Sequence, residues 1–370
     1  MRILIVGAGI AGLGIGWRLA QAGAEVTILE RGLAGREATW ASAGMLAPGA
    51  ELGSEGGPLV RFALDSRQAW TGFARDLQDA SSRDIGFRQD GSLIIAENET
   101  RARALEDRAA KLKAAGVDAT WLEPTELAAR EPLLAPTLRG ALHVGGDAQV
   151  DNRALAEALC IALGRSRGRL REYCEVHSLI IDKDRVRGAD AQDGPIESDA
   201  VILASGAWLN KIGGVSADDL PPVMPVKGQM IALERPSETR LPKALIWDDN
   251  VYLVPRRERL FIGATVEDAG FDTSVTLEAR DRLLAAAARL VPSASSWRLA
   301  EIWAGLRPRT PDGAPVLGQT EISGLYVAGG QFRNGILFAP LVADAMHRIV
   351  MGQPSGWAVA PFDPKRFRTS

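Results

Sequence analysis

The chain has 370 residues, of which 46% are hydrophobic and 24% are charged, a composition ordinary for a folded globular protein. Its formal net charge of −3 and its pI near 5.8 supply no positive field of the kind that nucleic acid or an anionic membrane requires, so we expect neither as a partner. The length exceeds the usual size of a single hydrophobic core and predicts two domains, or one domain with a large insertion.

The first elements of the chain are predicted in the order strand, turn, helix, strand. Apolar residues predict strands at Ile3–Val6 and Glu25–Leu29, and helical spacing predicts a helix over Ile10–Ala22 that ends before Gly23. This order opens a doubly wound α/β unit. The apolar run could also pass for a signal peptide after Arg2, but five glycines between positions 7 and 16 interrupt it.

A stretch of small residues at 38–50, a glycine-rich loop at 53–58 and a helix over 59–77 complete the first predicted segment. From residue 85 the pattern of predicted strands and helices changes, and we expect an inserted second domain. Across this domain and the rest of the chain, the predicted helices are 102–115, 153–163, 277–290 and 336–351. The predicted strands are 86–96, 223–233, 251–254, 260–265 and 325–328, and the segment 123–138 contains several prolines. Asp151 is the predicted N-cap of the second of these helices.

Two domains of discontinuous sequence follow from these elements. The first is predicted to comprise residues 1–84, 140–220 and 301–370, and the second residues 85–139 and 221–300. The chain has two cysteines, which cannot form a disulfide framework, and three histidines without metal-ligand spacing: Cys160, Cys174, His143, His177 and His347. We therefore expect no metal and a reducing, cytoplasmic location.

The turn after the first strand carries a dinucleotide-binding motif. Gly7, Gly9 and Gly12 form GxGxxG, and Glu30 ends the following strand. The glycines serve a tight turn, a close backbone approach to a pyrophosphate and close helix–strand packing, while the helix N-terminus presents free N–H groups to phosphate. Glu30 can accept hydrogen bonds from a ribose and argues against NADP, because it would repel a 2′-phosphate. The alternative is a merely glycine-rich turn.

The small-residue segment Ala38–Pro48 separates FAD from NAD, because an NAD enzyme does not need it. This segment resembles the flavin-contacting stretch of the glycine oxidase and D-amino-acid oxidase family of FAD-dependent oxidoreductases, and most of all that of bacterial glycine oxidases. Three further regions extend the resemblance, at 201–208, 251–265 and 305–337. The alternative for 38–48 alone is a tightly packed loop.

The resemblance implies an α/β fold in which a Rossmann-like FAD-binding domain is assembled from discontinuous segments and a mainly antiparallel sheet of an α+β substrate domain covers the flavin. Thr39 and Ser42 are expected to donate hydroxyl groups to phosphate or ring. The predicted cofactor contacts are Gly7, Gly9, Ile10, Ala11, Gly12, Glu30, Arg31, Thr39, Ser42, Ala43, Gly44, Met45, Val176, Ala204, Gly206, Trp208, Gly330, Arg333, Asn334, Gly335, Ile336 and Leu337. FAD is expected to be non-covalent, because neither cysteine lies near the segment where some relatives attach it; both fit an apolar helix or strand face.

The predicted chemistry is transfer of a hydride from a substrate Cα to the flavin, for which the protein supplies mainly orientation and charge. A planar arginine fork suits a substrate carboxylate better than a lysine does. The resemblance assigns this role to Arg307 and a hydroxyl partner to Tyr252; Arg333 could serve substrate, flavin or a structural pair. Gln331 stands where the family commonly has a histidine, and residues 248–250 replace another, which puts substrate preference in doubt.

The sequence therefore predicts an oxidase of glycine or a small D-amino acid that uses O₂ and yields an imine and hydrogen peroxide, and the resemblance implies a link to the thiazole of thiamine. A dehydrogenase for D-amino acids, sarcosine or proline analogues is the alternative. A flavin-dependent tRNA-modifying component and a non-enzymatic flavoprotein are less favoured, because no basic stripe is present and because Arg307 and Tyr252 would have no role. Family precedent favours a homodimer or homotetramer.

Overall fold

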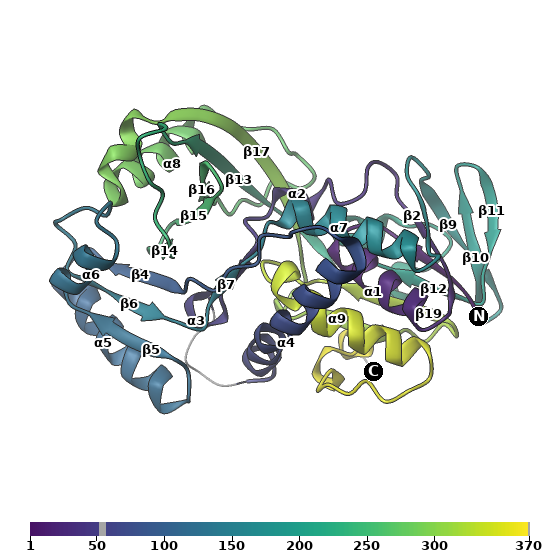
Figure 1. The fold of residues 1–370 in the computed structure, drawn as a ribbon. Coiled ribbons are helices and arrows are strands. Elements are labelled where there is room, and N and C mark those ends of the chain that lie inside the picture. Colours follow the sequence, from purple (N-terminus) through teal and green to yellow (C-terminus); the bar gives the residue numbers. More distant parts are fainter. Residues whose placement is uncertain (52–56, 369–370) are drawn as a thin grey trace.

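The computed structural model describes residues 1–51 and 57–368 and arranges them around two large sheets (Figure 1). Most of the glycine-rich loop predicted at 53–58 lies outside the described residues. In Figure 1 the six-stranded sheet occupies one lobe and the eight-stranded sheet the other, and the chain crosses between them several times. The result is the α/β architecture with one mainly parallel and one mainly antiparallel sheet that the sequence predicts.

The first sheet has the strand order β18-β19-β12-β1-β2-β8. All neighbouring strands are parallel except β18, which pairs antiparallel to β19 at the edge. The bounds of its strands are β1 Arg2–Val6, β2 Glu25–Leu29, β8 Arg169–Arg171, β12 Ala200–Leu203, β18 Val316–Gln319 and β19 Leu325–Gly329.

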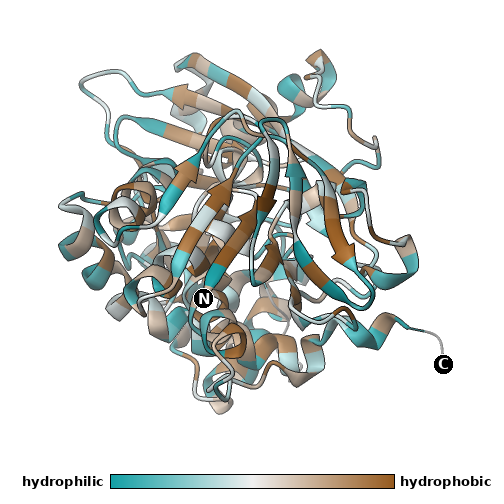
Figure 2. Ribbon diagram, turned by 90° about the vertical axis from the view of Figure 1, so that its right-hand side faces the viewer, coloured by the Kyte–Doolittle hydropathy of each residue, from teal (hydrophilic) through white to brown (hydrophobic). Residues whose placement is uncertain are grey.

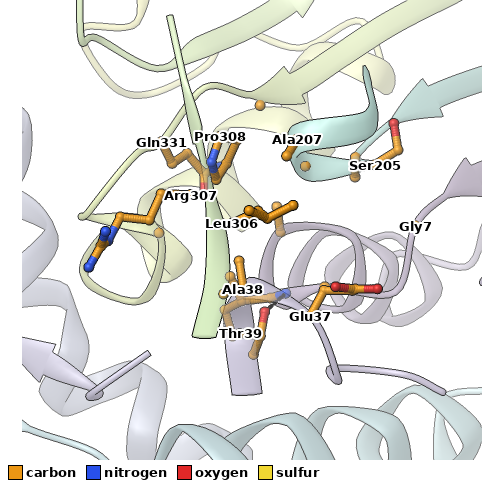
Figure 3. A pocket seen from close by; sticks show the side chains of 18 of the residues that line it. Gly7, Glu37, Ala38, Thr39, Ser205, Ala207, Leu306, Arg307, Pro308 and Gln331 are labelled. Carbon is orange, nitrogen blue, oxygen red and sulfur yellow. Dashed lines mark hydrogen bonds between the residues drawn. The ribbon is translucent and has the colours of Figure 1, made fainter. Parts of the chain in front are cut away.

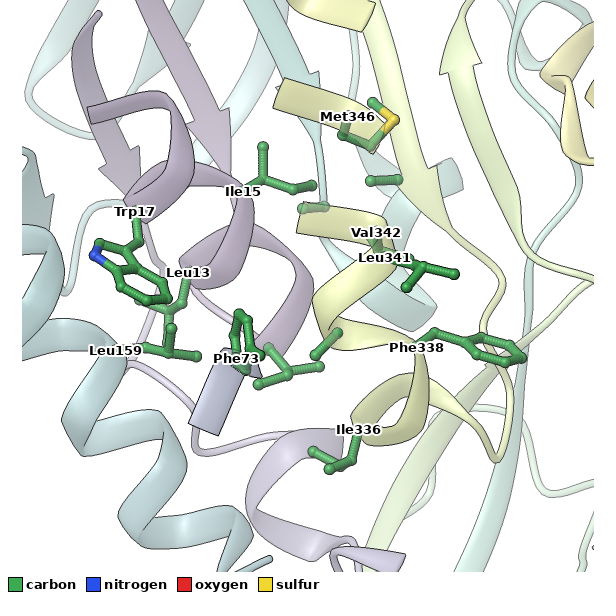
Figure 4. Packing of buried hydrophobic residues seen from close by; sticks show 14 of the residues in the cluster. Leu13, Ile15, Trp17, Phe73, Leu159, Ile336, Phe338, Leu341, Val342 and Met346 are labelled. Carbon is green, nitrogen blue, oxygen red and sulfur yellow. The ribbon is translucent and has the colours of Figure 1, made fainter. Parts of the chain in front are cut away.

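Both faces of this sheet are covered, which explains why its strands are apolar without alternation. Ile3 and Ile5 of β1 point into the helical core, whereas Leu4 and Val6 point into a second core. The helical core packs α1 against α9, and Figure 4 shows Ile15 on the side of α1 that faces Val342, with Leu13 beside Trp17 and Leu159. The helices of this face are α1 Ile10–Gln21, α4 Pro58–Ser81, α7 Asn152–Arg165 and α9 Gly335–Val350. The other face is covered by β9 Val176–Asp182, β10 Arg185–Ala191 and β11 Gly194–Glu197.

The second sheet has the strand order β17-β13-β16-β15-β14-β4-β6-β5 and is antiparallel except between β14 and β4. Alternate residues again enter two cores: Tyr252 and Val254 of β15 lie in one, and Leu253 in the other. In Figure 2 the strands of both sheets are mainly brown and the connecting loops mainly teal. The elements of this layer are β4 Ser92–Ala96, β5 Ala119–Leu122, β6 Gly140–Val144, β13 Met224–Glu234, β14 Leu245–Trp247, β15 Tyr252–Arg256, β16 Arg259–Gly263, β17 Arg298–Arg309, α5 Glu99–Ala114, α6 Pro124–Arg130 and α8 Leu277–Leu290.

Two strands of the second sheet come from segments that the sequence analysis gave to the first domain. β17 pairs with β13 from Met224 opposite Arg309 to Glu234 opposite Arg298, and β6 pairs with β4 and β5. We therefore propose that the domain boundaries fall after β6 and after β17 rather than at residues 140 and 301.

Short elements join the two layers. They are α2 Ala38–Ala41, β3 Met45–Leu46, α3 Pro48–Glu51, β7 Ala148–Gln149 and the 3₁₀ turns η1 Gly206–Lys211, η2 Ala217–Asp219, η3 Pro292–Ser296, η4 Ala360–Phe362 and η5 Pro364–Phe367. Asp151 caps α7 as predicted, because its side chain accepts hydrogen bonds from the N–H groups of Arg153 and Ala154. The strand predicted at 86–96 is shorter than expected, since Gly86 and Gly91 adopt positive φ angles before β4 begins.

Candidate functional site

A pocket extends from the β1–α1 turn to the end of β17 and is lined by residues of both layers. Figure 3 shows Gly7 at one end of the view and Arg307 at the other, with Thr39 and Gln331 between them. The first end carries the glycine motif, and the second end carries the residues predicted to hold a substrate.

The three motif glycines have different roles in the β1–α1 turn. Gly7 has a φ of +104°, and a Cβ on it would lie 2.6 Å from the carbonyl oxygen of Ala204. A Cβ on Gly12 would lie 2.0 Å from the carbonyl oxygen of Gly7. By contrast, a Cβ on Gly9 would meet only the hydroxyl oxygen of Thr39, at 3.5 Å. Gly7 and Gly12 therefore serve the packing of the turn, and Gly9 leaves space beside the helix N-terminus, where N–H groups lack intrahelical partners.

Glu30 is held at the end of β2 by two backbone donors. Its Oε2 accepts a hydrogen bond of 2.8 Å from Ala8 N–H, and its Oε1 accepts one of 3.1 Å from Gly32 N–H. A carboxylate can accept about four hydrogen bonds. Glu30 thus keeps acceptor capacity for ligand hydroxyl groups in the pocket it lines.

Beside Glu30 the pocket is bordered by a cation on an aromatic ring. The Arg31 guanidinium carbon lies 3.8 Å from the ring centroid of Trp208, and Arg31 also forms an ion pair of 2.6 Å with Glu37. Cys174 lines the same end, in the loop between β8 and β9 rather than on the helix or strand face that was predicted. Its backbone N–H donates to the carbonyl of Glu30, which explains its burial in this loop.

The hydroxyl groups of the small-residue segment make local bonds. The Oγ1 of Thr39 accepts a hydrogen bond of 2.9 Å from Ile10 N–H at the start of α1. The hydroxyl of Ser42 donates to the carbonyl of Thr39 at 2.9 Å. In this geometry the Ser42 proton stabilises the turn of α2, whereas the sequence analysis expected it to face a ligand.

Arg256 and Asn152 hold this segment in place, and neither was singled out as a site residue. Arg256 is buried and donates to the carbonyls of Ala43 (2.7 Å) and Val150 (2.9 Å) and to Asn152 Oδ1 (3.0 Å). Burial lowers the pKa of Arg256 to about 10, and a nearby carboxylate, 3.3 Å away on Asp151, opposes the shift. The signal for Arg256 in the sequence was a charged residue directly after the apolar run Val251–Pro255.

Arg307 extends from β17 at the opposite end of the pocket (Figure 3). Its Nη1 donates to the carbonyl of Thr265 at 3.2 Å and more weakly to that of Lys227 at 3.4 Å. The guanidinium lies over Gly228, where a Cβ would come within 2.2 Å of it. Within residues 1–51 and 57–368 no carboxylate forms an ion pair with Arg307. Among the described residues its charge is therefore faced by carbonyl groups and the Tyr252 side chain and by no carboxylate.

Tyr252 lies beside Arg307 and is buried among apolar residues of β13 and β14. Its hydroxyl is 3.6 Å from the sulfur of Met230. Burial raises the pKa of Tyr252, and the positive charges of Arg307 and Arg333 only partly oppose this effect. The hydroxyl therefore stays protonated at neutral pH and can act as a donor in the pocket.

Arg333 forms an ion pair with Glu51, the last residue of α3. The Glu51 side chain is 11% exposed, and both residues line the pocket. Of the three roles considered for Arg333, a structural pair is thus present. Glu51 itself was missed, since it lies far from Arg333 in the sequence and no motif includes it.

The N-terminus of α9 brings unpaired polar groups to the pocket. Gln331 Nε2 and Asn334 Oδ1 are buried, and neither has a hydrogen-bond partner among the described residues. Of the two residues, Gln331 lines the pocket and Asn334 lies just behind its wall. A Cβ on Gly335 would lie 3.3 Å from Gln331 Oε1, so a larger residue would crowd the Gln331 side chain at the first turn. Such orphaned groups at the positive end of a long helix indicate a polar ligand.

The structure brings most predicted site residues to this one pocket. Those that line it are Gly7, Gly9, Ile10, Ala11, Glu30, Arg31, Thr39, Ser42, Ala43, Gly44, Met45, Val176, Ala204, Gly206, Trp208, Tyr252, Arg307, Arg333, Gly335 and Ile336. Those that lie behind its wall are Gly12, Gly330, Asn334 and Leu337. Leu337 belongs to the helical core, where its carbonyl accepts bonds from Ser66 and Trp70. A Cβ on Gly330 would collide with the Thr310 side chain.

The described residues fit a dinucleotide with an aromatic head group. The acceptors of Glu30 suit a ribose, the open face of Gly9 suits a pyrophosphate and the orphaned Gln331 amide near α9 suits a polar ring, and all three residues line the same pocket. In the part of the chain that the structure describes, no group of three or more potential metal-ligating side chains is present, and no helix is long and apolar enough to cross a membrane. The fold and the pocket define a flavin-binding protein.

Comparison with known proteins gives the family. Residues 2–348 match the model of the DAO family, described as FAD dependent oxidoreductase, and the chain belongs to this family. FAD is thus its cofactor. A relative named glycine oxidase, from Geobacillus kaustophilus, is 35% identical over 98% of this chain and 96% of its own length. The crystal structure of glycine oxidase from Geobacillus kaustophilus superposes with a TM-score of 0.92 over 99% of both chains.

A second relative is longer. The bifunctional protein ThiO/ThiG of Nostoc sp. is 34% identical over 98% of this chain, but the match spans only 55% of that protein. The present chain therefore corresponds to about half of that relative.

Proposed function

We propose that this protein is an FAD-dependent oxidase of glycine or another small amino acid. The observation that carries the proposal is Arg307, an arginine without a carboxylate partner among the described residues, beside the Tyr252 hydroxyl in a pocket continuous with the cofactor end. The relatives that match over nearly the whole chain are named for glycine oxidation. A substrate carboxylate on Arg307 would neutralise the guanidinium charge, which no carboxylate of the described residues now balances.

The residues of this chain bind and orient the substrate in the proposed reaction. FAD held in the pocket would supply the acceptor for a hydride from the substrate Cα, and its reoxidation by O₂ with two protons would give hydrogen peroxide. Arg307 holds the carboxylate, and Tyr252 donates a hydrogen bond to it. The substrate amine loses its proton as the imine forms, and water then converts the imine to an oxo acid and ammonia. The N-terminus of α9 stabilises negative charge on the ring side of the pocket.

The predicted homo-oligomer and the cytoplasmic location stay part of this proposal, as does the supply of an imine for the thiazole of thiamine. The last of these is suggested by the ThiO/ThiG relative, of which this chain covers about half.

The test is a panel of amino acids scored by anaerobic bleaching of the flavin spectrum, followed by oxygen uptake with the best substrate. We expect glycine or sarcosine to bleach the flavin and O₂ to restore it with formation of peroxide. Bleaching without oxygen uptake would identify the alternative, a dehydrogenase. No bleaching by any amino acid would contradict both.

A further inference from the structure

Three charged side chains gather around Tyr252 at the substrate end of the pocket. Arg307, Arg333 and Glu51 all line the pocket, and all three act electrostatically on the Tyr252 hydroxyl. Two positive charges and one negative charge leave a net charge of one positive. This net charge matches one carboxylate and no more.

The two arginines are not equivalent. Arg333 Nε donates to the Glu51 carboxylate, whereas Arg307 donates to the backbone carbonyls of Thr265 and Lys227 and shares a hydrogen bond with the Tyr252 side chain, none of which is a carboxylate. The Glu51 side chain is 11% exposed and that of Arg333 is 35% exposed, so solvent screens the pair less than a surface pair. A ligand carboxylate thus finds Arg307 available and Arg333 already neutralised.

We propose that Glu51 determines the charge class of the substrate: it neutralises Arg333 and so restricts the pocket to amino acids that carry a single carboxylate. A second carboxylate would have to displace Glu51 from Arg333 or lie beside it as a like charge. Both cost free energy in a partly buried site. This inference rests on the proposed function, in which Arg307 binds the first carboxylate.

Removal of the Glu51 charge should therefore open the pocket to dicarboxylates. In Glu51→Gln the glutamine side chain keeps nearly the same shape, and Arg333 becomes free to bind a second carboxylate. If Glu51 instead bound the substrate amine, the same substitution would weaken the binding of monocarboxylate and dicarboxylate substrates alike.

The test uses the FAD-loaded protein and two secondary amines that differ by one carboxylate, sarcosine and iminodiacetate. Anaerobic stopped-flow reduction gives kcat/KM for each. In Glu51→Gln we expect the ratio of iminodiacetate to sarcosine to rise at least about tenfold over wild type, equivalent to about 1.4 kcal/mol. The gain should vanish in the double variant Glu51→Gln/Arg333→Gln. An unchanged ratio, or an equal fall for both amines, would overturn the proposal.

Asp65→Asn is the matched control, because it removes the same charge from an ion pair with Arg61 on α4, outside the pocket. Its substrate ratio should equal that of wild type. Glu51→Ala provides a second charge-removing variant if the amide disturbs folding.

A binding measurement separates this proposal from the proposed function. Perturbation of the bound-flavin spectrum gives the Kd of malonate and of acetate without turnover. Malonate should gain affinity relative to acetate in Glu51→Gln by the same factor, and an equal response of both acids would overturn the role of Glu51. If wild type binds acetate but reduces its flavin with no amino acid, the proposed function fails while the charge selection by Glu51 is still decided.

Discussion

Replacement of Arg307 by alanine should abolish most turnover while FAD stays bound. Only Nη1 of Arg307 donates to protein carbonyls, which leaves the other donors of its five N–H groups for a planar pair with a carboxylate. Two charge-assisted hydrogen bonds of roughly 1.5 to 3 kcal/mol each correspond to about 3 to 6 kcal/mol. At about 1.4 kcal/mol per factor of ten, kcat/KM should fall by roughly two to four orders of magnitude.

The assay is anaerobic flavin reduction by the best substrate, with the bound-flavin spectrum as a control for folding. Arg307→Lys should recover activity only in part, because an ammonium lacks the planar fork. Arg309→Ala is the matched control, since Arg309 is exposed on the same strand and does not line the pocket. If Arg307→Ala reduces its flavin at nearly the wild-type rate while Arg333→Ala does not, the carboxylate assignment is wrong and Arg333 takes the role.

Three further predictions concern the cofactor and the fold. Gly9→Ala should weaken FAD binding with little change in the Tm of the apoprotein, because a Cβ on Gly9 would meet no backbone atom. Gly7→Ala should lower that Tm, because a Cβ on Gly7 would lie 2.6 Å from the carbonyl oxygen of Ala204. Flavin titration measures the first effect and calorimetry the second. Burial raises the pKa of Asp147 from 3.8 to about 7. Its contribution to stability is therefore fully present below pH 3.8 and is lost as the pH rises to 7. Asp147→Asn should remove this pH dependence of Tm, and parallel curves of Tm against pH for the two proteins would contradict the prediction. Acid denaturation should release FAD into the supernatant, and colour retained in the protein pellet would show a covalent bond.

Some features of the site were predictable because their cause is local in sequence. The β1–α1 turn and the acid after β2 lie within the first 30 residues, and the spacing of Gly7, Gly9, Gly12 and Glu30 reflects the geometry of one strand–turn–helix unit. Periodicity likewise predicted α8, which spans the expected residues Leu277–Leu290. Such patterns need no knowledge of the rest of the chain.

The assignment of β17 depended on a partner far away. Its sequence contains a motif that resembles the family, but nothing within the segment indicates that it pairs with β13 in the second sheet. Strand pairing is selected by side-chain packing across the sheet, and the sequence of one strand does not name its neighbour. The predicted domain boundaries therefore do not coincide with the division of the strands between the two sheets.

The sequence by itself determined the dinucleotide-binding turn and the α/β class, because short motifs with set spacing carry them, and its resemblance to the family singled out Arg307 and Tyr252, whose role in substrate binding stays a prediction. Only the tertiary structure decided which charges are free. Glu51 meets Arg333 across 282 positions and Arg256 reaches the carbonyl of Ala43 across 213. Whether a charged side chain is paired, buried or available depends on groups that folding brings together from distant segments, and no local pattern of residues records that encounter.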